Sequence, residues 1–266
     1  MYKIIDSHCH IYPDAIAEKA ANGTGDFYGI NMAYDGKVST LLCEGEKAGI
    51  GHYIVQSVAT TPKQVSSINN YIAKAVKESN GLMTGLGTLH PESDDIKADF
   101  DELISLGLKG VKIHPDIQGF KLDDYRCLKF YELCEGKIPI LIHTGDKRYD
   151  FSNTNRLIPI LDIFTNLTII GAHFGGWSVW EEATKELKGY KNLYVDCSSS
   201  FYSMSKQTAK KLIEEYGTDR VLFGTDYPMW SPKGELDYFY SLGFSDEDNK
   251  KILHDNAADL FGIKNV

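Results

Sequence analysis

The segment Lys3-Ile4-Ile5-Asp6-Ser7-His8 is a short β-branched run that continues into Cys9-His10. A short apolar run of this kind is typical of a buried strand. Alternate side chains of a strand point to the same face, so we expect His8 and His10 to enter one cavity. The same alternation turns Cys9 to the opposite face, where core packing is the simplest role. A metal ion would explain the paired histidines.

Seven further runs of this kind follow along the chain, separated by stretches with the apolar spacing of amphipathic helices. Eight strand–helix alternations predict parallel strands joined by right-handed crossovers. A closed (β/α)8 barrel and an open doubly wound sheet both fit, and eight strands in 266 residues favour the closed α/β barrel. The predicted strands are Lys3–His8, Gly51–Val58, Leu82–Leu89, Leu108–His114, Ile138–His143, Leu167–His173, Asn192–Cys197 and Arg220–Asp226.

Glycines and capping residues mark the predicted helix ends. Capping boxes are expected at Thr61–Gln64, which has proline at the first helical position, and at Ser178–Glu181. Six glycines each follow a helical stretch and precede a strand, where a left-handed cap is expected. These glycines are Gly49, Gly81, Gly107, Gly136, Gly189 and Gly217.

The composition indicates one domain over residues 1–266, because 42% of the residues are hydrophobic and no linker-like tract interrupts the pattern. A formal net charge of −9 argues against nucleic acid and anionic membranes as partners and favours a small molecule. No apolar leader follows Met1 and no run of 18 apolar residues occurs, so we expect a cytoplasmic protein. Five scattered cysteines suit reduced thiols. A homo-oligomer is compatible with this sequence.

One region departs from the regular alternation. Between His10 and Lys37 the chain is too long for a simple loop and is rich in aromatic residues and glycine. Residues 11–36 leave the predicted catalytic end of the first strand, so they could cover the cavity as a lid. A surface excursion or an oligomer contact explains the same segment equally well.

Six of the eight histidines fall at or just past the predicted carboxyl ends of strands. Those ends converge on one cleft in a parallel barrel, so residues distant in sequence meet there. His-x-His on the first strand, single histidines on the fifth and sixth and an aspartate ending the eighth are donors suited to zinc, with manganese or iron less favoured. The six histidines are His8, His10, His90, His114, His143 and His173.

Taken together, five motifs resemble the amidohydrolase-2 branch of the amidohydrolase superfamily of TIM-barrel enzymes, over a span from residue 6 to the Asn256–Phe261 terminus. Their ordered combination is specific, whereas each alone is weak. The motifs are Asp6-Ser7-His8-Cys9-His10, Gly110-Val111-Lys112-Ile113-His114-Pro115, His143-Thr144-Gly145, Ala172-His173-Phe174-Gly175-Gly176 and Phe223-Gly224-Thr225-Asp226-Tyr227-Pro228.

The resemblance implies one metal ion held by His8, His10, His143 and Asp226, with His173 nearby as an acid–base group. Such an ion lowers the pKa of bound water to about 7 and polarises a carbonyl group. Asp226 could accept the water proton, and His173, with a reference pKa of about 6.5, could deliver a proton near neutrality. We therefore take His173 and Asp226 as the candidate catalytic residues.

Lys112 has two interpretations. It could be a carboxylated bridge between two metals, with His173 on the second ion, as in the binuclear members of the superfamily. Its motif instead matches mononuclear relatives, in which Lys112 and His114 would face the substrate from one side of the strand. We favour a single ion.

Further residues near the mouth are candidates for binding substrate or for orienting ligands. Arg148 could clamp a carboxylate, although its charge run also suits a solvated loop. Tyr227 could form an aromatic pocket wall. Asp6 could orient a ligand imidazole or make a hydrogen bond within the first strand. Asp196 could contact a polar substrate, but a loop hydrogen bond is the simpler role.

We expect a metal-dependent hydrolase that attacks the carbonyl centre of a small amide, cyclic amide, lactone or ester. The alternative is a nonoxidative decarboxylase or hydratase of a small aromatic or unsaturated acid, because the resemblance covers those reactions on the same frame. A metal-binding sensor without catalysis is a third hypothesis, and intact Asp226 and His173 argue against it.

Overall fold

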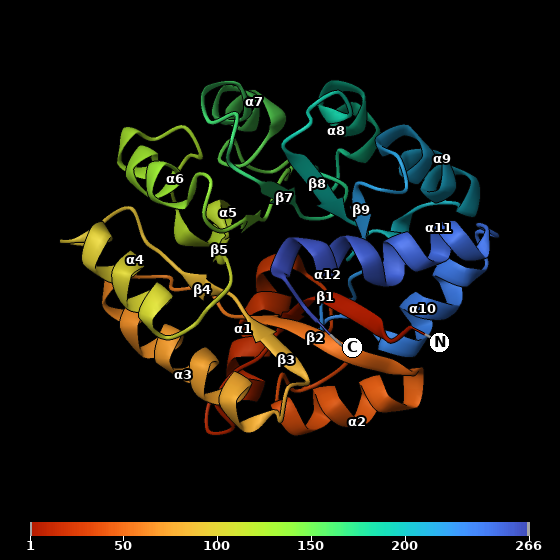
Figure 1. Cartoon of the computed structure of the whole chain (residues 1–266), viewed down its shortest axis with the longest axis horizontal. Helices are drawn as coiled ribbons and strands as arrows, with labels where there is room; N and C mark the ends of the chain where they lie inside the picture. Colours follow the sequence, from red (N-terminus) through yellow and green to blue (C-terminus); the bar gives the residue numbers. More distant parts are fainter. Residues whose placement is uncertain (1, 265–266) are drawn as a thin grey trace.

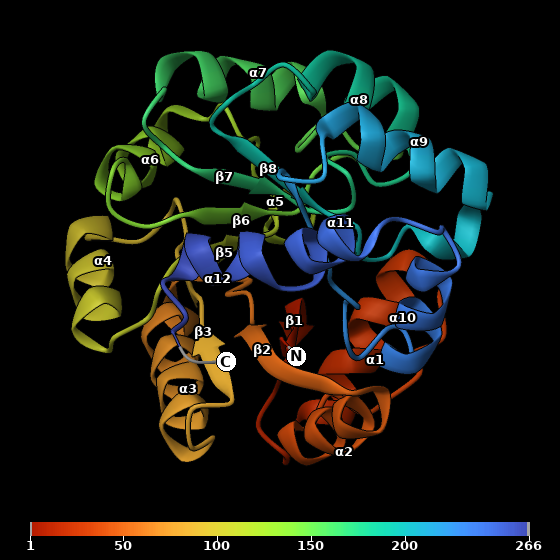
Figure 2. The same ribbon diagram turned by 45° about the vertical axis from the view of Figure 1, so that its right-hand side comes forward.

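The computed structural model describes residues 2–264, and helices alternate with parallel strands along this range (Figure 1). The strands are β1 (Ile4–His10), β2 (Ile50–Gln56), β3 (Met83–Gly85), β4 (Gly87–Thr88), β5 (Val111–Ile113), β6 (Ile140–Ile142), β7 (Ile169–Gly171), β8 (Leu193–Asp196) and β9 (Val221–Leu222). They form a central ring that the helices surround (Figure 2).

The helices are α1 (Ala17–Tyr28), α2 (Val38–Ala48), α3 (Val65–Glu78), α4 (Ile96–Ser105), α5 (Pro115–Gln118), α6 (Leu128–Cys134), α7 (Thr154–Ile163), α8 (Trp180–Leu187), α9 (Lys206–Tyr216), α10 (Pro232–Tyr240), α11 (Asp246–Lys250) and α12 (Asn256–Phe261). A π-helical turn over Lys251–Asp255 joins the last two. Across the described range, none of these helices combines the length and the apolar content that a bilayer span requires.

The ring of strands is closed by backbone hydrogen bonds at two places where the ladder is interrupted. Leu86 separates β3 from β4, and its N–H donates to the carbonyl of Val55 on β2 over 2.9 Å. β3 and β4 therefore form one interrupted strand. On the far side, the N–H of Ser7 on β1 donates to the carbonyl of Phe223 after β9, also over 2.9 Å. The predicted (β/α)8 barrel is confirmed.

The amino end of the barrel is plugged by apolar side chains. Those of the strands and of Leu86 pack against apolar side chains of α12, which lies across this end (Figure 2). Burial of such surface stabilises the barrel from within, and it leaves the open space at the carboxyl ends of the strands. The cluster includes Ile5, Ile54, Leu86, Leu141, Ile170, Leu222, Ala257 and Phe261.

The helix ends follow the predicted pattern with three exceptions. Four of the six predicted cap glycines have φ between 70° and 85°, and the capping box over Thr61–Gln64 is present. Gly217 combines φ of 91° with ψ of 137°, which lies outside the left-handed helical region, so that prediction is wrong. Gly189 is not left-handed, so that prediction is wrong. The box at Ser178 is also wrong, because Val179 is the N-cap of α8 and the Ser178 hydroxyl instead accepts the N–H of Lys147.

Candidate active site

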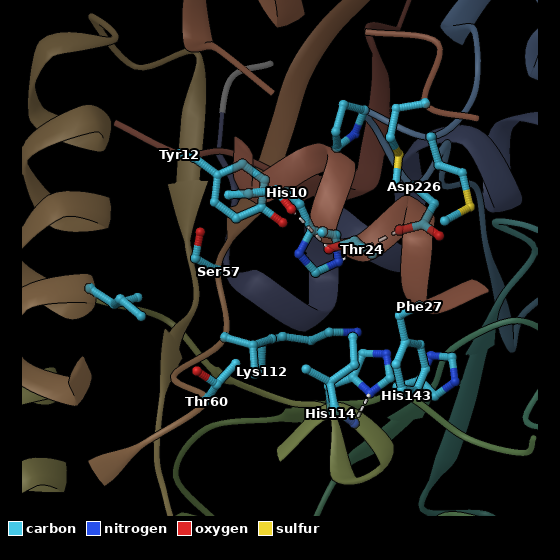
Figure 3. A pocket seen from close by; sticks show the side chains of 18 of the residues that line it. His10, Tyr12, Thr24, Phe27, Ser57, Thr60, Lys112, His114, His143 and Asp226 are labelled. Atoms are coloured by element: carbon cyan, nitrogen blue, oxygen red, sulfur yellow. Dashed lines mark hydrogen bonds and ion pairs between the residues drawn. The ribbon is translucent and has the colours of Figure 1, made fainter. Parts of the chain in front are cut away.

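A cavity of about 560 Å³ lies at the carboxyl ends of the strands and contains the predicted histidine cluster (Figure 3). The strand ends, with Lys112 and Asp226 among them, form its floor, and α1 with the start of α3 forms the opposite wall. Of the six strand-end histidines, His90 does not line it and instead accepts a backbone N–H with its Nδ1. The five that do are His8, His10, His114, His143 and His173.

The tautomer of His8 is set by the carboxylate of Asp196. Its Nδ1 lies 2.9 Å from Oδ2 of Asp196, which is fully buried at the end of β8. A carboxylate only accepts, so Nδ1 carries the proton and Nε2 turns its lone pair toward the cavity. Burial alone would raise the pKa of Asp196, but the neighbouring His8 and its hydrogen bonds hold that pKa well below the usual range. Asp196 therefore stays anionic.

Three predicted metal ligands converge on the cavity floor. Nε2 of His8 lies 3.2 Å from Nε2 of His10 and 3.4 Å from Oδ1 of Asp226, and the His10 nitrogen lies 3.6 Å from the same oxygen. Electron-rich donors this close together are stabilised by a cation between them. Two imidazoles and a carboxylate, with Asp196 orienting one ring, are suited to a divalent transition metal. These residues fit such an ion.

The fourth predicted ligand, His143, lies outside that group. Its Nδ1 is 3.1 Å from Nε2 of His173, and its Nε2 is 3.2 Å from the hydroxyl of Tyr28. His143 instead clusters with His114 and Asp116, and its ring stacks on that of His114 with centroids 3.9 Å apart. His143 could hold a metal only after one of its two hydrogen bonds is given up.

The tautomers along this row of histidines follow from the backbone at both ends. Nδ1 of His173 lies 2.9 Å from the carbonyl of Ser198, so it carries the proton and Nε2 accepts from Nδ1–H of His143. At the other end Nδ1 of His114 accepts a backbone N–H, so its Nε2–H donates to the Tyr28 oxygen over 2.6 Å. The Tyr28 hydroxyl then donates to His143. All three rings are neutral in this arrangement.

Burial shifts the basic groups of the cavity toward their neutral forms. It lowers the pKa of His173 to about 4, below the range near neutrality that the sequence suggests. It lowers the pKa of Lys112 to about 8, although Asp196 and Asp226 act in the opposite direction. Nζ of Lys112 lies 3.3 Å from Nε2 of His8. At neutral pH the cationic side chain on the floor is therefore Lys112.

Arg148, a predicted substrate clamp, does not line the cavity among the described residues, and it holds α1 instead. Its guanidinium pairs with the buried Asp146 over 2.7 Å, and Nη1 donates to the carbonyl of Phe27 at the end of α1, also over 2.7 Å. The group also lies over four aromatic rings, with 4.9–5.5 Å to their centroids. The N–H donors and the flat face of the Arg148 guanidinium thus contact other residues of the protein rather than the cavity.

Tyr227, predicted as part of the cavity wall, is another correction. Its side chain is fully buried, and its hydroxyl donates to the carbonyl of Lys37 over 2.8 Å. It is not among the described residues that line the cavity. Asp6 accepts the Thr225 hydroxyl over 2.6 Å and the backbone N–H groups of Thr225 and His8, so it holds strands together. The orienting role proposed for it belongs to Asp196.

Sequence reasoning missed Tyr28 as a residue of the site, and at Asp196 it missed the role of orienting His8. Tyr28 lies in the 11–36 excursion, and its position in the sequence does not indicate which strand end it contacts. Asp196 ends a predicted strand, and the rule that singled out the histidines would also have selected it. The excursion itself forms α1 and supplies a wall of the cavity.

Two site residues have unusual backbone conformations. His173 has φ of 59° and Asp226 has φ of 57°, in the left-handed region that side chains with a Cβ rarely adopt. Such conformations cost free energy and persist only where the surrounding structure imposes them. Here they follow β7 and β9 and turn both side chains into the cavity.

Comparison with known proteins agrees with this geometry. The family model described as "Amidohydrolase" matches residues 5–263. The chain belongs to this amidohydrolase family. The predicted resemblance is thereby confirmed, and membership indicates an enzyme.

Among curated proteins, the gamma-resorcylate decarboxylase of Polaromonas sp. (strain JS666) is 31% identical over 123 residues. That alignment covers 39% of this chain and 37% of the relative, so the chain matches well under half of the relative's length.

Among solved structures, a TIM-barrel protein from Bordetella bronchiseptica has a TM-score of 0.81 at 22% identity and covers 98% of this chain and 99% of its own. A dihydroxybenzoic acid decarboxylase from Polaromonas sp. JS666, with bound manganese and 2-nitroresorcinol, has a TM-score of 0.75 at 18% identity over 100% of this chain and 98% of that one. At these identities the structures support the barrel fold.

Proposed function

We propose that this protein is a divalent-metal-dependent, nonoxidative decarboxylase of a small aromatic carboxylic acid. The observation that carries the proposal is a cluster of potential metal ligands on the cavity floor, which faces a wall of aromatic and apolar side chains. The names of the curated relative and of the manganese-bound neighbour support decarboxylation over the hydrolysis that the sequence favours.

The proposed ligands are His8, His10 and Asp226, with His143 as a fourth once its hydrogen bond to Tyr28 is released. A divalent ion bound there would supply positive charge that attracts the carboxylate and hydroxyl oxygens of the substrate. Nitrogen-rich ligands suit zinc, whereas the solved neighbour holds manganese, so both metals belong in the first trials.

The chain's own residues would bind the acid and move one proton. Lys112 provides a fixed positive charge for an anionic substrate, and His114 and Tyr28 provide hydrogen-bonding groups beside it. A proton is added to the ring carbon that bears the carboxylate. The bond between the two carbons then breaks, its electron pair returns to the ring, and carbon dioxide leaves. His173 and Asp226 line the cavity and are the proposed proton carriers.

The experiment that tests this function is turnover of 2,6-dihydroxybenzoate by metal-loaded protein in heavy water. We expect carbon dioxide and a resorcinol with one deuterium at the former carboxylate position. His8→Ala should abolish both products. Hydrolysis of lactones or amides without carbon dioxide release from any aromatic acid would overturn the proposal in favour of a hydrolase.

A further inference from the structure

The cavity is much larger than a single aromatic ring requires. An apolar cavity of about 150 Å³ holds benzene, and pockets of about 300–1,000 Å³ hold drug-sized ligands. At about 560 Å³ this cavity belongs to the second class. A ring seated on the floor beside Lys112 and Asp226 would leave most of the volume unfilled.

The remaining volume has a distinct chemical character. Among the described lining residues, Lys112 and Asp226 carry the formal charges, and both belong to the floor. Thr60 and Ser57 lie on the other side of the cavity from Asp226 in Figure 3. Away from the floor the lining is mainly apolar. Its polar groups are uncharged and belong to Tyr12, Thr24, Ser57, Thr60, Gln64, Ser67 and Tyr71. A second charged group on the ligand would have no partner there.

The apolar lining away from the floor comes largely from two helices. On α1, the residues Ala20, Gly23 and Phe27 follow Ile16 at spacings of four, three and four, which places all four on one helix face. Ile68 and Tyr71 line the cavity from α3. We define the space between these two helix faces as the α1–α3 groove.

Two details indicate that the α1–α3 groove accepts an apolar ligand. Ile16 lines the cavity and is 51% exposed, so part of its apolar side chain is open to solvent. A Cβ added to Gly23 would meet no atom within 4 Å, so the helix face has room beside it. Covering exposed apolar surface with an apolar substituent is favourable by about 25 cal/mol per Å².

We propose that the aromatic acid taken by this enzyme carries an extended apolar substituent, alkyl or aryl, that lies in the α1–α3 groove while its carboxylate lies near Lys112. The acid head group rests on the proposed function, whereas the substituent rests on the groove. A fused or tail-bearing phenolic acid fits this description better than an unsubstituted dihydroxybenzoate.

The test measures binding rather than turnover, with resorcinol, 4-ethylresorcinol and 4-hexylresorcinol as unreactive probes on the metal-loaded full chain in a calorimeter. We expect each added methylene that enters the groove to tighten binding about fourfold, which corresponds to about 0.8 kcal/mol per buried CH2. Equal affinity for all three probes would overturn the proposal.

Two substitutions on α1 locate the effect. Ala20→Phe fills the groove and should remove the dependence on chain length while resorcinol still binds. Asn22→Phe places the same side chain at an exposed position of α1 outside the cavity lining and should preserve it. Loss of the dependence in both variants, or in neither, would overturn the assignment to the groove. Ile68→Ala, which shortens the α3 side of the α1–α3 groove, should lower the gain per methylene.

The outcomes also separate this inference from the proposed function. If the probes show the length dependence but no acid releases carbon dioxide, the groove stands and the decarboxylase fails. If short and long acids are decarboxylated with equal kcat/KM and the probes bind alike, the decarboxylase stands and the groove proposal is wrong.

Discussion

The floor of the cavity and its α1 wall differ in what holds their side chains. His8 and Asp226 come from the ends of barrel strands, and hydrogen bonds to the buried Asp196 and Ser199 fix their orientation. The wall side chain Tyr28 comes from a helix inserted between β1 and α2. At its carboxyl end this helix is tied to the barrel loops through Arg148.

This difference matches two functions, metal binding by the floor and substrate binding by the wall. A metal site needs donors held within narrow limits, which the hydrogen-bonded strand ends provide. A substrate wall has to admit and release a ligand, which an inserted helix with few anchors can do by moving. Substitutions in the floor should therefore change metal binding, whereas substitutions in the wall should change substrate affinity and leave the metal in place.

The largest effect is expected from His8→Ala, because it removes a central donor of the floor. The purified variant should contain no stoichiometric metal and show no turnover, as measured by elemental analysis and carbon dioxide release. His90→Ala is the matched control, since His90 is also a buried strand-end histidine but does not line the cavity. Full metal content in His8→Ala would show that the floor is not the metal site.

Asp196→Asn should weaken metal binding by about 10–100-fold without removing any donor. An amide can present its NH2 to His8, so the proton is no longer held on Nδ1 and Nε2 is no longer kept as an acceptor. Competition with a chromophoric chelator measures the affinity. An unchanged affinity would contradict the role of Asp196 in setting this tautomer.

Tyr28→Phe should lower kcat/KM about tenfold while metal content stays at the wild-type level. The substitution removes the hydroxyl that joins His114 to His143, and a net hydrogen bond contributes about 0.5–1.5 kcal/mol. Steady-state kinetics and elemental analysis on the same preparation separate the two effects. Loss of metal in this variant would break the division between floor and wall.

Arg148→Ala should loosen α1 and increase KM roughly fivefold, because it removes the hydrogen bond to the Phe27 carbonyl. A hydrogen bond from a partly exposed group of this kind contributes about 1 kcal/mol. Limited proteolysis should cut the connection after α1 faster than in the wild type. Arg148→Lys keeps the charge but not the paired geometry, and it should give an intermediate rate. Equal protection in all three proteins would show that Arg148 is not an anchor.

The smallest expected effect is on the pH dependence of stability, and it involves neither the floor nor the α1 wall. His52 on β2 is buried, and burial lowers its pKa to about 4. The unfolded chain takes up this proton near pH 6.5 and the folded chain near pH 4, so stability should fall as the pH drops across that window. Urea unfolding at pH 7 and pH 5 should show a smaller loss for His52→Gln than for wild type. An equal loss would assign the acid sensitivity to other groups.

The floor could be predicted from the sequence because it depends on short-range rules. Strand periodicity pairs His8 with His10, and parallel strands bring distant ends such as His173 and Asp226 to one edge. The third strand was also predicted, but the hydrophobic pattern of the sequence does not indicate its interruption at Leu86.

The wall could not be predicted in the same way. Whether residues 11–36 approach the cavity depends on contacts between α1 and loops far along the chain, such as that of Arg148 with Phe27. Long-range contacts also keep two residues from the substrate-binding positions that their sequence neighbourhood suggested. Arg148 donates to the Phe27 carbonyl, and Tyr227 donates to the Lys37 carbonyl. The contact of His143 with Tyr28 could not be predicted either, because no local sequence pattern indicates which side chain of α1 lies beside His143.

The left-handed backbone at His173 and Asp226 has a consequence for engineering. Glycine at either position would relieve the local conformation and make the barrel harder to melt, at the expense of the side chain that the chemistry needs. A library screened for heat resistance alone would therefore tend to collect inactive barrels with replacements at these two positions. Selection for thermal tolerance in this scaffold has to score turnover in every round.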